Sequence, residues 1–343
     1  MTKPLIDPRC HEQRFTVIGS NSFSGSHCVD ELLRQGCEVL GISRSPEPAS
    51  VFLPYLWNSG ASRARRFTFR KLDLNHDASA LAEEIAAFRP HYVINFAAQG
   101  MVGESWEHPT DWYQTNVVAN VRLHDFLRQL DGMRKYIHVS TPEVYGNTDG
   151  LISENTRYCP STPYAASRAS CDLHLMTFYQ RYEFPVVFTR SANVFGPGQQ
   201  LYRIIPRTIL SVLLGRKLPL HGGGHSLRSF IHIRDVVAGT LAAARLADPP
   251  EIFHFATQRL ISIRELVQMI CERMGVSLGD VVEIAEDRAG KDKAYVLDTT
   301  KARKQLSWTD KVALETGIDE TIAWTRTHLK ELRGQPQSYE HKP

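Results

Sequence analysis

The chain has 343 residues, of which 42% are hydrophobic, and a formal net charge of +3 at pH 7. This length allows one large core or two domains, and the small net charge excludes a general electrostatic attraction to nucleic acid or to membranes. The six cysteines are scattered without a Cys-x-x-Cys pair, which favours reduced thiols in a cytoplasmic protein over a disulfide framework or a metal site. No apolar run approaches the roughly 18 residues of a membrane span.

Strands and helices alternate along the first half of the chain. Residues 15–18 predict a strand, 26–35 a helix closed by Gly36, and 38–42 a second strand. Further strands at 67–71, 92–96, 136–139 and 185–188 are interleaved with helices at 78–88, 111–130 and 163–182. This order is typical of an α/β Rossmann fold, a doubly wound parallel sheet whose ligands bind beyond the carboxyl ends of the strands.

The segment "VIGSNSFSGSH" joins the first strand to the first helix. Gly19 and Gly25 hold the outer positions of a dinucleotide-binding turn, and Ser22 stands where the middle glycine is usual. The serine hydroxyl and the flanking N–H groups can still hydrogen-bond a phosphate at the helix N-terminus. An ordinary serine-rich turn between strand and helix is the alternative.

The ends of the second and third strands carry the next candidate residues. Ser43 stands where an acidic residue would bind both hydroxyls of an adenosine ribose, and Arg44 follows it. An arginine suits a 2′-phosphate, so the residues favour NADP, while a solvent-facing arginine is the alternative. Asp73 and Leu74 are candidates to receive the adenine amino group.

Six segments resemble the extended short-chain dehydrogenase/reductase family, and within it the nucleotide-sugar 4,6-dehydratases. They run from residue 15 to residue 308 in the family's order: "VIGSNSFSGSH", "NFAAQ", "HVSTPEVYG", "TPYAASR", "NVFGPGQQ" and "LPLHGGGHSLRSFIHIRDV". The resemblance implies an NAD(P)-binding Rossmann domain over 1–190, with a strand or helix returning near 230–256. A smaller C-terminal lobe over 191–330 would bind a nucleoside diphosphate sugar, and a frayed tail would follow over 331–343.

The resemblance also implies the cofactor contacts and the assembly. Relatives pair through two long helices, and apolar residues in 111–130 and 164–182, such as Val117 and Leu173, have suitable spacing for a homodimer. The expected cofactor is NADP, with NAD possible. Its expected contacts are Gly19, Asn21, Ser22, Phe23, Ser24, Gly25, Ser43, Arg44, Asp73, Leu74, Ala97, Ala98, Gln99, Tyr164 and Arg168.

Tyr164 and Arg168 are the expected base and its cationic neighbour. Oxidation of a sugar hydroxyl needs a group that takes its proton while hydride leaves the carbon, and a tyrosine serves only if a positive charge stabilises the phenolate. The two residues are four apart, so a helix beginning near Pro163 would place them on one face. The family has lysine where this chain has Arg168, and arginine is not its equivalent.

In "STPEVYG", Thr141 matches the residue that orients the sugar O4, and Glu143 matches the dehydratases' glutamate. After oxidation at C4, the glutamate would remove the C5 proton as the C6 hydroxyl departs, and hydride would return to C6. Pro142 stands where the dTDP-glucose branch has an acidic proton donor, and proline cannot donate a proton. The GDP-mannose branch has a serine there.

The expected substrate contacts are Thr141, Glu143, Asn193, Arg228 and Arg288, of which the two arginines would clamp the diphosphate. Surface salt bridges are the alternative for both arginines. The basic stretch 63–71 is interpreted as a solvated face, and "HGGGH" as a turn with no metal bound.

The sequence thus predicts an NAD(P)-dependent nucleotide-sugar 4,6-dehydratase, a lyase. The alternatives are an epimerase, a reductase or a decarboxylase of the same family. A cofactor-binding relative without activity is a further alternative, since Ser22, Pro142 and Arg168 all depart from the family pattern.

Overall fold

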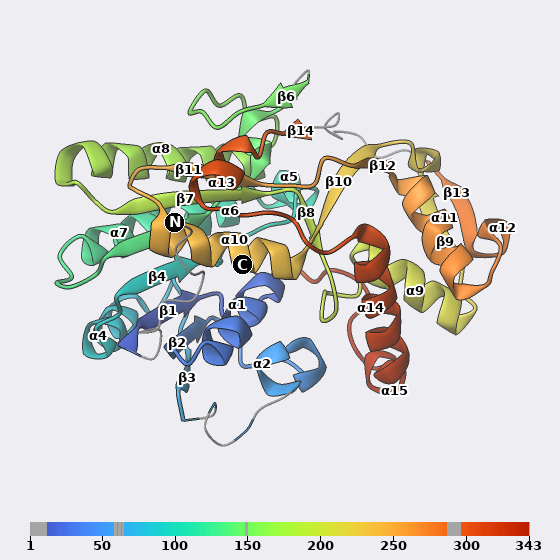
Figure 1. The fold of residues 1–343 in the computed structure, drawn as a ribbon, viewed down its shortest axis with the longest axis horizontal. Coiled ribbons are helices and arrows are strands. Elements are labelled where there is room, and N and C mark those ends of the chain that lie inside the picture. Colours follow the sequence, from blue (N-terminus) through green and yellow to red (C-terminus); the bar gives the residue numbers. More distant parts are fainter. Residues whose placement is uncertain are drawn as a thin grey trace.

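The structure, a computed structural model, describes residues 12–57, 60, 63, 65–147, 150–286 and 296–342. Its centre is a parallel sheet of seven strands in the order β3-β2-β1-β4-β5-β7-β11 (Figure 1). The order reverses between β1 and β4, which is the switch point beside which doubly wound sheets bind ligands. The predicted Rossmann sheet is confirmed. Its strands are β1 (Arg14–Ile18), β2 (Glu38–Ser43), β3 (Phe67–Lys71), β4 (Tyr92–Asn95), β5 (Lys135–Val139), β7 (Val186–Ser191) and β11 (Ile252–Phe255).

Helices cover both faces of this sheet because its strands are apolar on both sides. On one face lie α1 (Phe23–Arg34) and α10 (Ile233–Leu246), which contact each other. On the other lie α4 (Ala78–Phe88), α7 (Asn120–Leu127) and α8 (Pro163–Tyr182). The single helix predicted over 111–130 is divided in the structure. It consists of α6 (Pro109–Tyr113), a π-helical turn η3 (Gln114–Ala119) and α7, which ends at Leu127.

The second lobe lies to the right in Figure 1 and is built mainly from helices. Its strands form small sheets: β8 (Asn193–Phe195) pairs with β10 (Leu227–His232), which pairs with β12 (Leu260–Ser262), and β9 (Leu218–His221) pairs with β13 (Val282–Ala285). A further pair joins β6 (Leu151–Ile152) to β14 (Val296–Leu297). The lobe's helices are α9 (Ile204–Leu214), α11 (Ile263–Met274), α12 (Leu278–Val281), α14 (Leu314–Thr327) and α15 (Leu329–Leu332). Short turns complete the fold: η2 (Ser50–Phe52), α2 (Pro54–Trp57), α5 (Glu104–Glu107), η4 (Pro142–Tyr145) and η5 (Gly222–Gly224).

The chain returns to the Rossmann sheet twice after entering the lobe. The first return, α10 and β11, falls within the predicted 230–256. The second, around α13 (Thr300–Gln305), is not predicted by the sequence: Ala302, Leu306 and Trp308 are buried in the same cluster as Phe15 of β1. Two connections therefore tie the lobe to the sheet.

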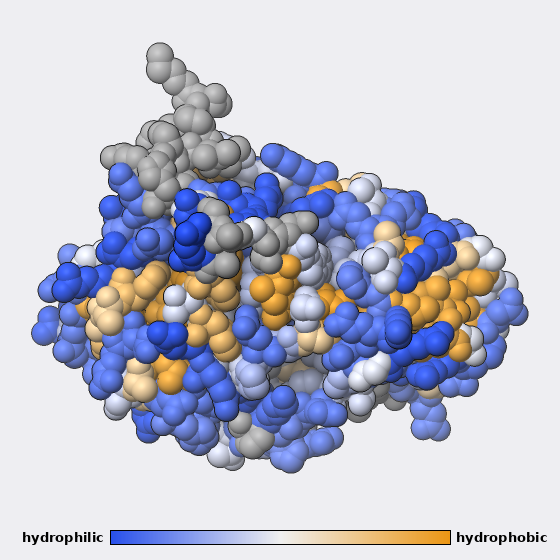
Figure 2. Space-filling model, turned by 90° about the horizontal axis from the view of Figure 1, so that it is seen from below, coloured by the Kyte–Doolittle hydropathy of each residue, from blue (hydrophilic) through white to orange (hydrophobic). Residues whose placement is uncertain are grey.

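The surface shows the expected mixture of residues. In the basic stretch 63–71, Arg63 pairs with Asp30 at 3.3 Å and Arg70 with Glu84 at 2.9 Å, as a solvated charged face would. On the face shown in Figure 2, hydrophobic residues gather in patches separated by hydrophilic ones. No helix in the described part of the chain has the length and apolar content that a membrane span requires.

The prediction of a frayed tail is wrong for the described residues after α15. Gln337, Tyr339 and His341 contact side chains of both lobes. The reason is composition: the tail carries an aromatic ring and an imidazole that find stacking and hydrogen-bond partners on the folded surface.

His27 connects the first helix of the Rossmann domain to the loop that enters the lobe. Its Nε2 lies 2.9 Å from the carbonyl oxygen of Pro197. Burial lowers the pKa of His27 to about 4, although the hydrogen bond to Pro197 acts in the opposite direction, and the charge of Arg234 lowers the pKa further. The ring is therefore neutral at pH 7 and donates its proton to the carbonyl.

His27 should make the protein less stable in mild acid. Because its folded pKa lies below the ordinary value of 6.5, the unfolded chain takes up the proton first. The stabilisation is complete above about pH 6.5 and is lost as the pH falls toward 4, by up to about 1.4 kcal/mol per pH unit. Urea unfolding at pH 7, 6 and 5 should show that the free energy of unfolding falls less steeply with pH in His27→Gln than in the wild type. The glutamine amide can still donate to the Pro197 carbonyl but does not take up a proton. Exposed His225→Gln is the control, and equal slopes for all three proteins would contradict this role of His27.

Candidate functional site

A cleft opens at the carboxyl ends of β1, β2 and β4, at the switch point of the sheet. Ten of the residues predicted to contact a cofactor line it: Gly19, Asn21, Ser22, Ser43, Arg44, Asp73, Leu74, Ala97, Ala98 and Gln99. Phe23, Ser24 and Gly25, in the first turn of α1, are not among its lining residues, and neither are Tyr164 and Arg168. Six further residues line it that the sequence analysis does not single out: Ile18, Ser45, Leu72, Asn75, Phe96 and Thr115.

The two glycines of the β1–α1 turn are required by close contacts between backbones. Gly19 has φ of +80°, and a Cβ there would lie 2.8 Å from the nitrogen of Ala97. A Cβ on Gly25 would lie 2.1 Å from the carbonyl oxygen of Gly19, far inside contact distance. The start of α1 therefore sits directly on the turn, and we call residues 19–25 the cradle. A helix N-terminus packed on a glycine turn is an arrangement that binds phosphate groups in dinucleotide-binding folds.

Ser22 is the N-cap of α1, which explains a serine in place of the middle glycine. Its hydroxyl oxygen accepts a hydrogen bond from the N–H of Gly25 at 3.1 Å. The hydroxyl proton stays available for donation to an oxygen in the cleft. Serine in place of glycine therefore prevents the closest approach of a ligand to the backbone at this position. In return it offers a side-chain hydrogen-bond donor at the same end of α1.

The end of β2 is held to the turn by a second set of hydrogen bonds. The Ser43 hydroxyl accepts from the N–H of Asn21 at 3.1 Å, and the Asn21 amide donates to the carbonyls of Ser45 and Pro46 at 3.0 and 3.1 Å. Arg44, on the rim, donates to the carbonyl oxygen of Lys342 at 3.0 Å. Ser43 therefore shapes the turn, whereas the cationic group at this rim belongs to Arg44.

Asn116 fixes the opposite rim, a role that the sequence analysis misses. Its side chain accepts from the N–H of Gln99 at 2.8 Å and donates to the Gln99 carbonyl and to Ser167 of α8 at 3.0 and 2.9 Å. The residue is fully buried. An asparagine among apolar residues of a predicted helix is the signal that could have identified it, because a buried amide must find hydrogen-bond partners.

Three of the predicted catalytic residues come together. Thr141 caps the turn η4, and its hydroxyl accepts from the N–H of Glu143 at 3.3 Å. Thr141 also shares a side-chain hydrogen bond with Tyr164, in the first turn of α8. Burial and the negative charge of Glu143 raise the pKa of Tyr164, whereas Arg168, the Thr141 hydrogen bond and Arg203 act to lower it. The hydroxyl is protonated at neutral pH in this structure.

Arg168 points away from the cleft and into the protein. It is 2% exposed, its Nη2 donates to the carbonyl of Val139 at the end of β5, and the same nitrogen lies 3.2 Å from His138 Nε2. The predicted contact with Tyr164 is thus electrostatic: the charge of Arg168 acts to lower the tyrosine's pKa.

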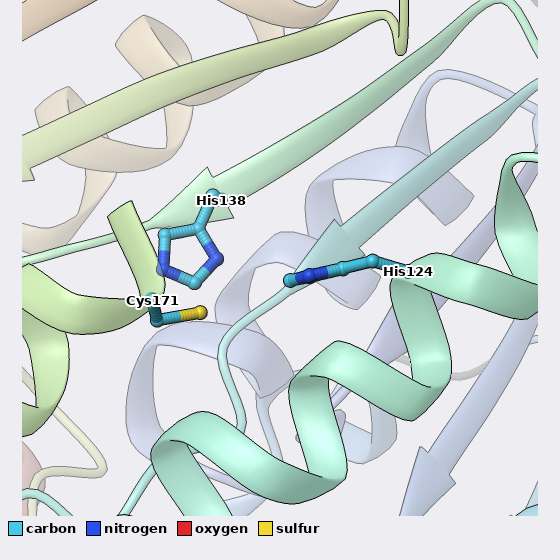
Figure 3. A group of neighbouring side chains, drawn as sticks. All are labelled: His124, His138 and Cys171. Atoms are coloured by element: carbon cyan, nitrogen blue, oxygen red, sulfur yellow. The ribbon is translucent and has the colours of Figure 1, made fainter. Parts of the chain in front are cut away.

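His138 also belongs to a buried group with His124 and Cys171, drawn in Figure 3. Two imidazoles and a thiol are a donor set that suits zinc. The Arg168 guanidinium beside His138 would repel a cation, and burial raises the pKa of the Cys171 thiol to about 12, which disfavours the thiolate. His124 Nε2 lies 3.0 Å from the Tyr136 hydroxyl. We therefore interpret the group as a hydrogen-bonded part of the core.

Two of the predicted substrate contacts lie on neighbouring strands of the lobe. Asn193 of β8 donates to the carbonyl of Ser229 at 3.3 Å, and Arg228 of β10 is half-buried and donates to the carbonyl of Leu227 at 2.7 Å. Asn193 is in register with Phe230, two residues beyond Arg228. Arg288 lies outside the described residues, so its predicted contact with the diphosphate stays a prediction.

Solved structures of nucleotide-sugar enzymes share this fold. A dTDP-glucose 4,6-dehydratase from Streptomyces venezuelae with NAD bound has a TM-score of 0.83 and 29% identity, over 93% of this chain and 98% of that one. A UDP-glucose 4-epimerase from Thermotoga maritima with UDP-glucose has a TM-score of 0.81 and 27% identity, over 92% and 100% of the two chains. The dTDP-glucose 4,6-dehydratase of Streptomyces antibioticus is 32% identical over 316 residues, 90% of this chain and 91% of that protein.

The sheet, the glycine turn and these similarities define an extended short-chain dehydrogenase/reductase of the nucleotide-sugar 4,6-dehydratase type. The model of the GDP-mannose 4,6 dehydratase family matches residues 16–321, and the chain belongs to that family. The resemblance inferred from the sequence motifs is confirmed.

Gly25→Ala should remove nucleotide binding. The added methyl group would displace the Gly19 carbonyl or the start of α1, and forced overpacking of this kind typically costs about 1–3 kcal/mol of stability. We expect calorimetric titration with NAD and with NADP to show at least a 30-fold loss of affinity. Gly100→Ala is the matched control, because a Cβ there meets nothing within 4 Å. An unchanged affinity for Gly25→Ala would mean that the cradle does not hold the cofactor.

Proposed function

We propose that the protein is an NAD(P)-dependent nucleoside-diphosphate-sugar 4,6-dehydratase. The observation that carries the proposal is the group formed by Thr141, Glu143 and Tyr164, in a member of the GDP-mannose 4,6 dehydratase family. The three side chains supply an orienting hydroxyl, a carboxylate and a phenol within one site. These are the groups needed for oxidation at C4 followed by elimination across C5 and C6.

The cofactor would lie in the cleft between the glycine turn and Gln99. The cradle of Gly19, Ser22 and Gly25 would hold its pyrophosphate, and Arg44 would face the adenosine ribose. When bound, the nicotinamide accepts hydride from one sugar carbon and returns it to another, so the reaction has no net redox change. Several similar structures contain NAD. We propose that this chain prefers NADP, because Arg44 follows Ser43 where an acidic ribose ligand would favour NAD.

Tyr164 would accept the proton of the C4 hydroxyl, with Thr141 holding the O4 atom. Burial and Glu143 raise the pKa of the tyrosine in the absence of ligands, so the phenolate is scarce at neutral pH. The positive charge of Arg168 acts in the opposite direction and favours the phenolate. Arg168 is therefore a positioning and electrostatic residue in our proposal, not a contact of the sugar.

Glu143 would remove the C5 proton after C4 has become a ketone. The departing C6 hydroxyl also needs a proton to leave as water. Pro142 is buried at the start of η4 and has no proton to give. We propose that Glu143, once it has received the proton from C5, supplies the leaving hydroxyl. One carboxyl group would thus act first as base and then as acid.

Epimerisation is the second candidate, favoured by the similarity to the UDP-glucose 4-epimerase. A C4 epimerase needs Tyr164 and Thr141 but no group that acts on C5. Glu143 therefore distinguishes the two functions. A binding protein without turnover would need none of the three side chains to be placed together.

Solvent deuterium separates these functions. In D₂O, the wild-type protein with NADP and a panel of nucleotide sugars should give a 4-keto-6-deoxy product with deuterium at C5, seen by mass spectrometry. Tyr164→Phe should stop all conversion, and Glu143→Gln should lower product formation about 10²–10⁴-fold because an amide cannot take the C5 proton.

Glu83→Gln, an exposed carboxylate on α4, is the control and should leave the rate unchanged. Inversion at C4 without deuterium at C5 would identify an epimerase. A Glu143→Gln rate within about fivefold of wild type would place the base elsewhere.

Arg44→Ala should reduce the preference for NADP. A charge-assisted contact with a phosphate is worth about 1.5–3 kcal/mol, so we expect the ratio of the NADP and NAD dissociation constants to change at least 10-fold toward NAD. The ratio is the useful quantity, because general effects on the cleft cancel in it. Exposed Arg122→Ala on α7 is the control. An unchanged ratio would mean that Arg44 does not face the 2′-phosphate.

A homodimer is part of the proposal. Its support is the partly exposed apolar surface on η3, α7 and α8, where Leu173 is 49% and Val118 39% exposed. Such residues on adjacent helices form a surface that a second copy could cover.

A further inference from the structure

Residues 335–342, which we call the strap, follow α15 and lie along the protein surface. Gln335, Gln337, Tyr339 and His341 are half-buried, and the residues between them are exposed. This alternation of half-buried and exposed residues is expected for an extended chain that packs one of its sides against the protein surface.

The first part of the strap contacts the lobe. The Gln337 side chain accepts from Arg216 Nη1 at 3.0 Å, just beyond α9. The ring of Tyr339 meets the ring of Tyr202 edge to face, with centroids 5.7 Å apart. The strap therefore begins on the lobe.

The second part of the strap contacts the Rossmann domain. His341 Nε2 lies 2.7 Å from the carboxylate of Asp111 in α6, and the imidazole stacks on Trp112 and on His108 with centroids 5.2 and 4.7 Å apart. His108, Asp111 and His341 could offer ligand atoms to a metal ion. The two imidazole planes are within 2° of parallel, and stacked rings cannot both direct an in-plane lone pair at one ion. We interpret the contact as stacked rings with a hydrogen bond between His341 and Asp111.

The strap ends on the cofactor cleft. The carbonyl oxygen of Lys342 accepts from Arg44 Nη1 at 3.0 Å and from Gln99 Nε2 at 2.6 Å. Arg44 follows β2, Gln99 follows β4, and both line the cleft. One carbonyl group thus joins the two rims across the mouth of the cleft.

We propose that the strap is a gate that competes with the cofactor for Arg44 and Gln99. The inference rests on the proposed place of the cofactor. Phosphate oxygens make charge-assisted hydrogen bonds with arginine that are stronger than those of a neutral carbonyl, so a bound dinucleotide displaces the strap. In the absence of cofactor the strap closes the cleft. The apparent affinity for the cofactor is then the intrinsic affinity multiplied by the fraction of molecules whose cleft is open.

Removal of the gate should strengthen cofactor binding. Calorimetric titration with NADP and with NAD should give dissociation constants about 3–30-fold lower for a chain ending at residue 334 than for the full chain, as expected if the strap is closed in most molecules. His341→Ala in the full chain should give part of the same gain, because it removes the Asp111 pair and the Trp112 stack. Glu340→Ala, at an exposed position of the strap, is the matched control and should bind as the full chain does.

A spin label reports the movement without any reaction. A nitroxide attached at Glu340→Cys in a Cys159→Ser chain should become more mobile when NADP is added, because the end of the strap leaves the cleft. The Cys159→Ser chain treated with the same label is the blank.

Four results would overturn the proposal. Equal affinities for the full and shortened chains would show that the strap does not compete, and weaker binding by the shortened chain would make the strap a support for the cofactor. A label that becomes less mobile with NADP would likewise show that the strap supports the cofactor. If neither chain binds NADP or NAD, the cofactor assignment fails together with the gate. The absence of any binding heat distinguishes this outcome from the other results.

Discussion

The close approach of α1 to the β1–α1 turn is the constraint on which the site depends. With a Cβ on Gly25 the helix would collide with the Gly19 carbonyl, and with a Cβ on Gly19 the turn would collide with the backbone after β4. The absence of two methyl groups thus lets three backbone segments meet at one edge of the sheet. Because the segments meet there, Ser22 lines the cleft while it caps the helix, and its hydroxyl proton can still be donated.

A buried charge network connects the segments that carry Thr141 and Tyr164, two of the predicted catalytic residues. Asp172 of α8 accepts from Arg190 of β7 and from the Ser140 hydroxyl, each at 2.8 Å, and lies 3.3 Å from His138. Burial alone would raise the pKa of Asp172, but the attraction of Arg190 and the hydrogen bond with His138 outweigh it and lower the pKa to about 2. The carboxylate therefore stays charged, and a fully buried charge is tolerated only when it is paired. Ser140 precedes Thr141 in the chain, and Asp172 lies on the same helix as Tyr164. The network therefore fixes the distance between the hydroxyl groups of Thr141 and Tyr164.

The sequence predicts most elements that follow from local patterns. Helix α4 spans the predicted residues 78–88, and α8 begins at Pro163 after the capping Thr162. The features that it misses depend on contacts between distant residues. The direction of Arg168 is decided by a carbonyl of β5, and the strap is held by Asp111, which is 230 residues away from His341 in the chain. The return of Trp308 to the sheet is equally nonlocal. Local periodicity carries no information about such pairings.

The three departures from the family pattern do not bear equally on activity. Ser22 in place of glycine keeps the helix end occupied by a hydrogen-bonding group. Arg168 in place of lysine keeps a positive charge near Tyr164, although its guanidinium is bound to the Val139 carbonyl and faces away from the cleft. Pro142 alone removes a chemical capability, because neither its ring nor its backbone carries a proton to donate. It also begins the turn that Thr141 caps, so the same residue that lacks the acid helps to position Glu143. In our proposal the chemical difference between this chain and a dTDP-glucose dehydratase therefore narrows to the source of one proton. Glu143, whose negative charge acts on Tyr164, is the carboxyl group that would supply it.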